Sequence, residues 1–70
     1  SNKEIERSKK LPSLIKTCES EIAKIDRELA QFDYSQMDSD STKKLQELNQ
    51  KKTQEEEKLL ALYEELESLA

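Results

Sequence analysis

Apolar residues recur at alternating intervals of four and three along the first half of this 70-residue chain. The series has no gap and consists of Leu11, Ile15, Cys18, Ile22, Ile25, Leu29 and Phe32. An average interval of 3.5 residues keeps these side chains on one stripe of an α-helix, which is the seam of a coiled coil. The stripe therefore predicts a helix that packs against a second helix.

The second half of the chain repeats the same spacing. Its seam positions are Leu45, Leu48, Lys52, Glu55, Leu59, Leu62, Leu66 and Leu69. Two of them are polar, and two interpretations of these remain open. The aliphatic stems of Lys52 and Glu55 can cover the seam while their charged ends reach water, or the two residues form a weak polar layer that fixes the register or marks a contact site.

Between the two stripes lies a segment rich in serine and aspartate, residues 33–41. Such side chains compete for backbone hydrogen bonds, so they end helices and start turns. We expect Ser39 or Asp40 to cap the second helix. The sequence predicts an all-α fold, an antiparallel two-helix coiled-coil hairpin over residues 11–70, with helices at about 12–32 and 42–69.

A register follows if Phe32 lies opposite Leu45, because every seam residue of the first helix then meets one of the second. Flanking residues of opposite charge would pair as Glu28 with Lys51 and Glu21 with Lys58. Such exposed pairs contribute to register more than to stability.

Pro12 lacks a backbone N–H and interrupts what would otherwise be a longer first helix. Helix one therefore either begins at Pro12 or kinks there. We expect residues 1–10 to be a lead-in segment, a short helix or a linker, broken from helix one near this proline. Four apolar residues off the seam, Ile5, Leu14, Leu60 and Tyr63, gather near this end. They predict that the lead-in segment packs over the hairpin there.

Composition narrows the possible functions. Charged residues make up 40% of the chain, glycine and histidine are absent, and Cys18 is the only cysteine. A single cysteine without histidine forms neither an internal disulfide nor a Cys/His zinc site, and a two-helix rod has no pocket to perturb a catalytic carboxylate. We expect no enzymatic activity, no metal and no cofactor in this domain, no membrane span, and a cytoplasmic location.

The stretches KKLPSLIKTCESEIAKIDRELAQ, FDYSQMDSDS and TKKLQELNQKKTQEEEKLLALYEELESL together resemble the C-terminal coiled-coil domain of ABC-F proteins. These are soluble ATPases with two ATP-binding cassettes. Leu11-Pro12 matches a leucine-proline step, Phe32 and Tyr34 match an aromatic loop, and the segment 62–66 matches the end of the domain. The resemblance implies a non-catalytic module of a parent that uses ATP, with contacts to nucleic acid, to the ribosome or to the parent's own cassettes.

The net charge of −4 opposes simple attachment to phosphate. Basic residues are nevertheless unevenly placed. The candidate phosphate contacts are Lys9, Lys10 and Lys16, with Lys3 and Arg7, at the open end, and Lys43, Lys44 and Lys51 near the tip. The alternative is that they are ordinary solvated helix faces.

Other functions remain open at this point. The chain can be a structural or protein-interaction hairpin, or a homodimer of two hairpins, although we expect a monomeric hairpin rather than a dimer. A helical arm of an aminoacyl-tRNA synthetase, which binds tRNA, is a further alternative, and its tip is tighter than the one expected here.

Overall fold

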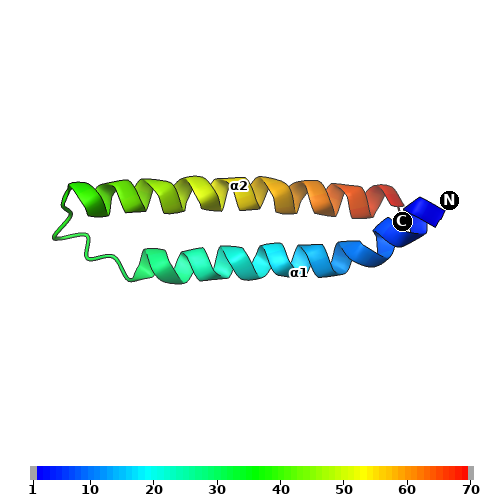
Figure 1. The fold of residues 1–70 in the computed structure, drawn as a ribbon, viewed down its shortest axis with the longest axis horizontal. Coiled ribbons are helices and arrows are strands. Elements are labelled where there is room, and N and C mark those ends of the chain that lie inside the picture. Colours follow the sequence, from blue (N-terminus) through cyan, green and yellow to red (C-terminus); the bar gives the residue numbers. More distant parts are fainter. Residues whose placement is uncertain (1, 70) are drawn as a thin grey trace.

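The computed structural model describes residues 2–69, and within them the chain forms two helices and no strand. Helix α1 spans Asn2–Ala30 and helix α2 spans Ser39–Leu69. Figure 1 shows them side by side and antiparallel, joined by a turn at one end, with both termini at the other. The rod measures 54 × 15 × 14 Å. The prediction of an all-α helical hairpin is confirmed.

The core of the rod is the line of contact between the two helices. Leu11 and Ile25 are almost completely buried in it. The other buried side chains are Ile15, Cys18, Leu48 and Leu62. Half-buried seam residues complete the stripe, namely Ile22, Leu29, Phe32, Leu45, Lys52, Glu55, Leu59, Leu66 and Leu69. Every position of the two heptad series is thus at least partly shielded from water.

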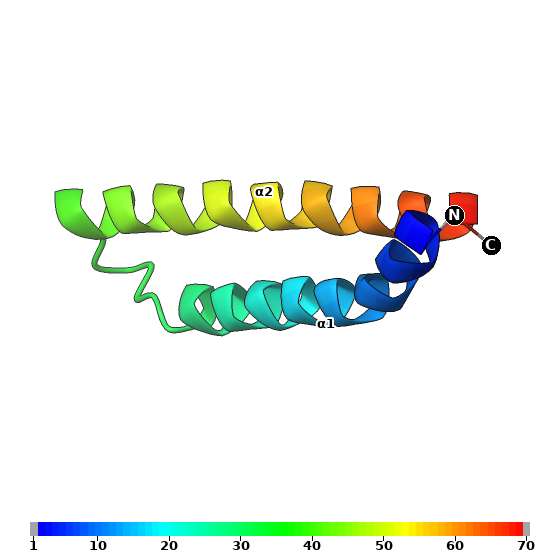
Figure 2. The same ribbon diagram turned by 45° about the vertical axis from the view of Figure 1, so that its right-hand side comes forward.

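Helix α1 begins at Asn2 and continues through Pro12, so the helix kinks at the proline and does not begin there. Proline removes one hydrogen bond, the bond from its own nitrogen to the carbonyl four residues earlier, and its ring pushes the preceding turn aside. The other turns of the helix keep their hydrogen bonds, so α1 bends where it might have ended. Figure 2 shows this bend near the N-terminal end of α1.

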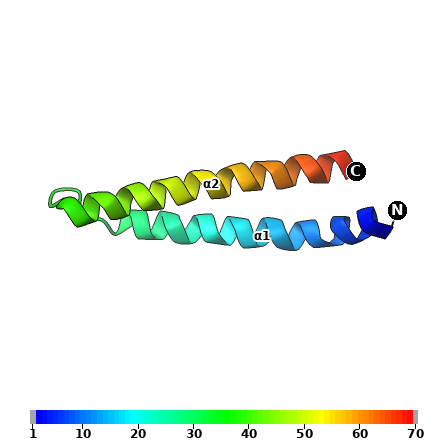
Figure 3. The same cartoon turned by 45° about the horizontal axis from the view of Figure 1, so that its top comes forward.

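The helix pair is held at the bent end by two contacts. Leu11, directly before Pro12, is 0% exposed. One turn earlier, the Arg7 guanidinium binds the Glu65 carboxylate of α2 through two hydrogen bonds, Nε to Oε2 at 2.5 Å and Nη2 to Oε1 at 3.1 Å. These contacts keep the first turns of α1 beside the end of α2, as Figure 3 shows from another side.

The turn between the helices is built from its own polar side chains. Asp33 Oδ1 accepts hydrogen bonds from the backbone N–H and the hydroxyl of Ser35. The Tyr34 hydroxyl donates to the backbone oxygen of Leu29, 2.9 Å away, and so satisfies a carbonyl at the end of α1. Asp33 and Ser35 therefore shape the turn itself, as the composition of residues 33–41 indicated, while Tyr34 supplies the side-chain contact at the end of α1.

Asp38 caps helix α2, whereas Ser39 and Asp40 were the predicted caps. Its Oδ1 accepts the backbone N–H of Ser41 at 2.7 Å, and its backbone oxygen accepts the N–H of Thr42 at 2.9 Å. A capping side chain binds the N–H two or three residues on. With Asp38 as the cap, the first helical residue is Ser39, three residues before the predicted start.

The predicted flanking ion pairs are replaced by another. Lys51 Nζ lies 2.8 Å from Glu21 Oε1, and neither Glu28–Lys51 nor Glu21–Lys58 is formed. The prediction assumed that Phe32 is a helical seam residue opposite Leu45. Helix α1 ends at Ala30, so Phe32 belongs to the turn and does not define the register of the helices.

Candidate interaction surfaces

A polar layer crosses the middle of the seam. The Cys18 thiol lies 3.0 Å from the backbone oxygen of Glu55 and 3.2 Å from its carboxylate Oε2. Burial raises the pKa of the Cys18 thiol, and the hydrogen bond to Glu55 raises it further. The thiol is therefore neutral at physiological pH and is a poor nucleophile, since the thiolate is the reactive form.

Lys52 fills the next seam position toward the tip. Its side chain is half buried, and its Nζ lies 2.6 Å from Asp26 Oδ1 on α1. The hydrogen bond to Asp26 raises the pKa of Lys52 and keeps it cationic. Lys52 thus covers the seam with its stem while its charge is paired at the edge of the rod. Glu55 behaves differently, because it receives a hydrogen bond from inside the seam.

The candidate lysines fall into two groups at opposite ends of the rod. Lys9, Lys10 and Lys16 are exposed on α1 near the termini. Lys43 and Lys44 are exposed at the start of α2, beside the turn. The structure does not bring the two groups together into one basic surface.

Two of the predicted basic residues are already paired. Lys51 binds Glu21, and this hydrogen bond raises the pKa of Lys51 and lowers that of Glu21. Arg7 is bound to Glu65 in the same way. Each of these cations is neutralised within the hairpin, so a phosphate would have to compete with a carboxylate for it.

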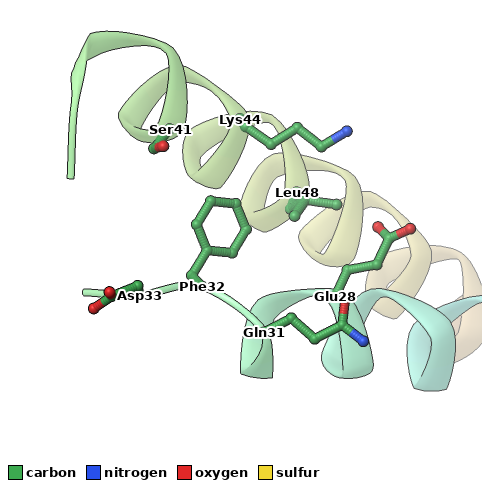
Figure 4. Close-up of a pocket in the computed structure, with 7 residues that line it drawn as sticks. All are labelled: Glu28, Gln31, Phe32, Asp33, Ser41, Lys44 and Leu48. Carbon is green, nitrogen blue, oxygen red and sulfur yellow. The ribbon is translucent and has the colours of Figure 1, made fainter. Parts of the chain in front are cut away.

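A shallow pocket of about 420 Å³ lies beneath the turn (Figure 4). The Phe32 ring points across it toward α2, and the Lys44 side chain extends along its far side. Its lining combines both charges with apolar surface and consists of Glu28, Gln31, Phe32, Asp33, Ser41, Lys44 and Leu48. The sequence contained no signal for this hollow, because it forms only where the chain leaves the helical seam.

Two aromatic rings lie at the tip. Phe32 is half buried and Tyr34 is 58% exposed. Their ring centroids are 6.2 Å apart with an angle of 41° between the planes, which is a tilted aromatic pair. Tyr34 therefore has a fixed position but leaves much of its surface open.

The off-seam apolar residues do not form the predicted covering contact. Ile5 is 55% exposed and Leu60 is 60% exposed. The first turns of α1 bend toward the end of α2 (Figure 2), but this bend leaves both side chains largely open to water. Tyr63 is nevertheless held, because its hydroxyl donates to Glu19 Oε2 on α1, 3.2 Å away.

The described residues hold no group of three or more histidine, cysteine or acidic side chains arranged to bind a metal ion. Between residues 2 and 69, no helix is long and apolar enough to cross a membrane. No protein-family model, no curated protein and no solved structure matches this chain.

Proposed function

We propose that this hairpin is a non-catalytic, nucleic-acid-contacting arm, and that its parent is an ATPase of the ABC-F type. The observation that carries the proposal is the exposed pair Lys43 and Lys44 at the start of α2, at the same end of the rod as the exposed ring of Tyr34. Lysines supply charge for phosphate, and an aromatic face supplies a surface on which an unpaired base stacks.

The shape of the molecule supports an arm. Both described ends lie together, and the turn lies at the far end of a rod 54 Å long (Figure 1). A hairpin attached through its open end would hold the tip away from its parent. The resemblance of the chain to the C-terminal domain of ABC-F proteins supplies the class of parent, and RNA of the ribosome or DNA is the partner that this class implies.

Electrostatics limit how strongly the tip can bind. The chain carries a net charge of −4, which repels phosphate at long range. Two lysines neutralising two phosphates of a duplex give a slope of about −1.8 in a plot of log affinity against log salt concentration. We therefore expect weak binding that increases at low salt.

The test is titration of the chain into fluorescently labelled single-stranded RNA, hairpin RNA and duplex DNA over a salt series. The variant Lys43→Ala/Lys44→Ala should lose most of the binding and flatten the salt slope. The matched control is Lys24→Ala/Lys58→Ala, which removes the same charge from exposed positions away from the tip. Equal loss in both double variants would contradict binding at the tip.

A third variant separates stacking from charge. Tyr34→Leu keeps the charge and should weaken binding to single-stranded RNA more than to duplex DNA. The class of parent is tested independently, by reading the sequence that precedes the hairpin in the full-length protein. A phosphate-binding glycine-lysine loop is expected there, and its absence would remove the ATPase from the proposal.

A further inference from the structure

The pocket beneath the turn brings an aromatic ring together with charged groups of both signs (Figure 4). Its volume of about 420 Å³ lies within the range of small-ligand pockets. The apolar part of its lining consists of the half-buried ring of Phe32 and the side chain of Leu48, which is 7% exposed. Such a lining suits a ligand that is flat and apolar on its faces and polar at its edges.

The turn holds the Phe32 ring in position. Tyr34 lies beside it, with 6.2 Å between the two ring centroids. The Tyr34 hydroxyl is itself fixed, because it donates a hydrogen bond to the backbone oxygen of Leu29. Figure 4 shows the Phe32 ring extending from the turn toward α2. An aromatic ring fixed in the wall of an open pocket is a surface on which a nucleobase stacks.

Polar side chains of the pocket are left without partners in the hairpin. Among the described residues, 2–69, no hydrogen bond or ion pair engages the side chains of Glu28, Gln31 or Lys44. Asp33 differs, because its Oδ1 accepts hydrogen bonds from both the N–H and the hydroxyl of Ser35. Glu28 and Lys44 can therefore bind a ligand without breaking a contact that shapes the turn.

The two charges come from different helices. Glu28 lies in the last turn of α1, and Lys44 lies in the second turn of α2. A purely cationic ligand would be repelled by Lys44, and a purely anionic one by Glu28. A nucleotide avoids both conflicts, because its flat base separates the hydrogen-bond donors at one edge from the phosphate at the other end.

We propose that this pocket binds one unpaired base of a single-stranded RNA. The base lies against the Phe32 ring, its donor edge meets the Glu28 carboxylate, and the adjoining phosphate meets Lys44. Because the pocket is shallow, the sugar and phosphate stay outside it and continue into the strand. The inference rests on the proposed function, since it names the group that the arm would bind.

The carboxylate of Glu28 predicts which base is preferred. Guanine presents two adjacent donors, N1–H and N2–H, which match the two acceptor oxygens of a carboxylate. Adenine and cytosine present one amino group beside an acceptor nitrogen. Uracil presents a single N–H between two carbonyl oxygens, which a carboxylate repels. We therefore expect guanine to bind most tightly and uracil most weakly.

The test uses four RNA pentanucleotides that consist of uridines with guanosine, adenosine, cytidine or uridine at the central position. Each is titrated into the isotope-labelled chain and followed by the NMR shifts of its backbone amides. The strand with guanosine should bind at least about fivefold more tightly than the strand of uridines alone. The largest shifts should fall in residues 28–33 and 41–48, which contain the pocket lining.

Glu28→Gln is the decisive variant, because an amide replaces one acceptor oxygen with a donor. It should reduce the ratio of guanosine to uridine affinity to about twofold or less. The matched control is Glu47→Gln, which removes the same charge from an exposed position of α2 outside the pocket lining. The control should leave the ratio unchanged, since a change in net charge acts on all four strands alike.

Phe32→Leu tests stacking. It keeps an apolar side chain in the pocket but should weaken the binding of all four strands by about fivefold. Circular dichroism verifies that the variant keeps its helices. If Phe32→Leu disturbs the turn, the ratio measured with Glu28→Gln still decides the proposal.

The outcomes separate this inference from the proposed function. Equal binding of all four strands, with a loss in Lys43→Ala/Lys44→Ala, would overturn the base pocket and leave the nucleic-acid-contacting arm in place. Failure of every strand to bind would overturn both. Tighter binding of N-acetylarginine amide than of guanosine monophosphate would also overturn the base pocket, because it would show that the carboxylates select a cationic side chain of a protein.

Discussion

The two halves of the seam hold the same helices together with different chemistry. In the half near the termini, Leu11, Ile15, Cys18 and Leu62 form one buried cluster, against which Leu59, Leu66 and Leu69 pack. In the half near the tip, Ile25 and Leu48 are buried too, but Lys52 and Glu55 stand between α2's apolar positions. Their charged ends find partners in Asp26 and Cys18.

This difference shows that a heptad seam tolerates polar residues where their stems remain in the interface and their polar atoms are paired. The apolar half supplies burial, which is independent of direction. The polar half supplies contacts that are satisfied in only one alignment of the helices. We infer that the first half mainly sets stability and the second contributes mainly to register.

The largest effect should come from removing an apolar anchor in either half. Leu11→Ala and Ile25→Ala each delete a side chain that is 0–1% exposed, and each should lower the free energy of unfolding by about 3 kcal/mol. Urea denaturation followed by circular dichroism measures this. Leu60→Ala is the control, since that residue is 60% exposed, and it should change stability by less than about 0.5 kcal/mol. A much smaller loss for Ile25→Ala than for Leu11→Ala would show that the halves unfold separately.

Replacing the polar layer should act in the opposite direction. Glu55→Leu extends the apolar cluster toward the tip and should raise the free energy of unfolding by about 1 kcal/mol. In this variant the Cys18 thiol can still donate to the backbone oxygen of residue 55. Glu57→Leu makes the same change at an exposed position and should give no gain. A loss of stability in the Glu55→Leu variant would mean that the layer stabilises the fold as well as the register.

The cap of α2 should have an intermediate effect that depends on pH. The hydrogen bond from the Ser41 N–H lowers the pKa of the Asp38 carboxyl. Its contribution is therefore complete above the ordinary carboxyl pKa, about 3.9, and is lost as pH falls through the lower value of the folded state. Asp38→Ala should lower the melting temperature by roughly 5 °C at pH 7.

The difference between wild type and Asp38→Ala should shrink below about pH 4, as carboxyl groups become protonated in both states. Asp40→Ala, in the same first turn but not the capping residue, is the matched control and should be nearly silent. An Asp38 effect of constant size from pH 7 to pH 2 would contradict a charged cap.

The smallest effect should come from the ion pair at the open end. Arg7 and Glu65 are bound through two hydrogen bonds, but their side chains keep 45% and 34% of their surface exposed. Arg7→Ala should lower the melting temperature by less than about 2 °C, and high salt should remove the difference. Lys10→Ala serves as the control on the same helix. A larger, salt-resistant loss would show that this pair holds the bent segment of α1 in place.

The turn at the tip is the part of the fold whose position the sequence predicts but whose details it does not. The concentration of aspartate and serine in residues 33–41 marked where the first helix ends, because these side chains bind backbone groups locally. The cap of α2 is Asp38, one residue before Ser39 and two before Asp40, the two predicted candidates. The pocket beneath Phe32 required knowing that this residue leaves the helix.

Pro12 shows a different limit of what the sequence can predict. The missing N–H and the bulk of the ring are properties of one residue, and they indicate a disturbance in the helix. Whether the helix ends or bends depends on what the neighbouring turns contact. Here Leu11 is buried in one cluster with Leu62 of α2 and Arg7 binds Glu65, so the turns before the proline are held against α2 and the helix stays continuous.

The sequence by itself determined that this chain forms two helices, which residues of each face the other, and that the chain folds back between them. Those properties follow from a repeat of 3.5 residues and from local hydrogen-bonding preferences, both of which are readable along the chain. Tertiary structure decided which charged residues pair, which residue caps α2, and which apolar side chains remain exposed at the open end. The charged pairs depend on the height of one helix against the other, and a shift of a few residues changes every flanking pair while leaving the stripes intact. The cap is decided by the local path of the chain from the turn into α2.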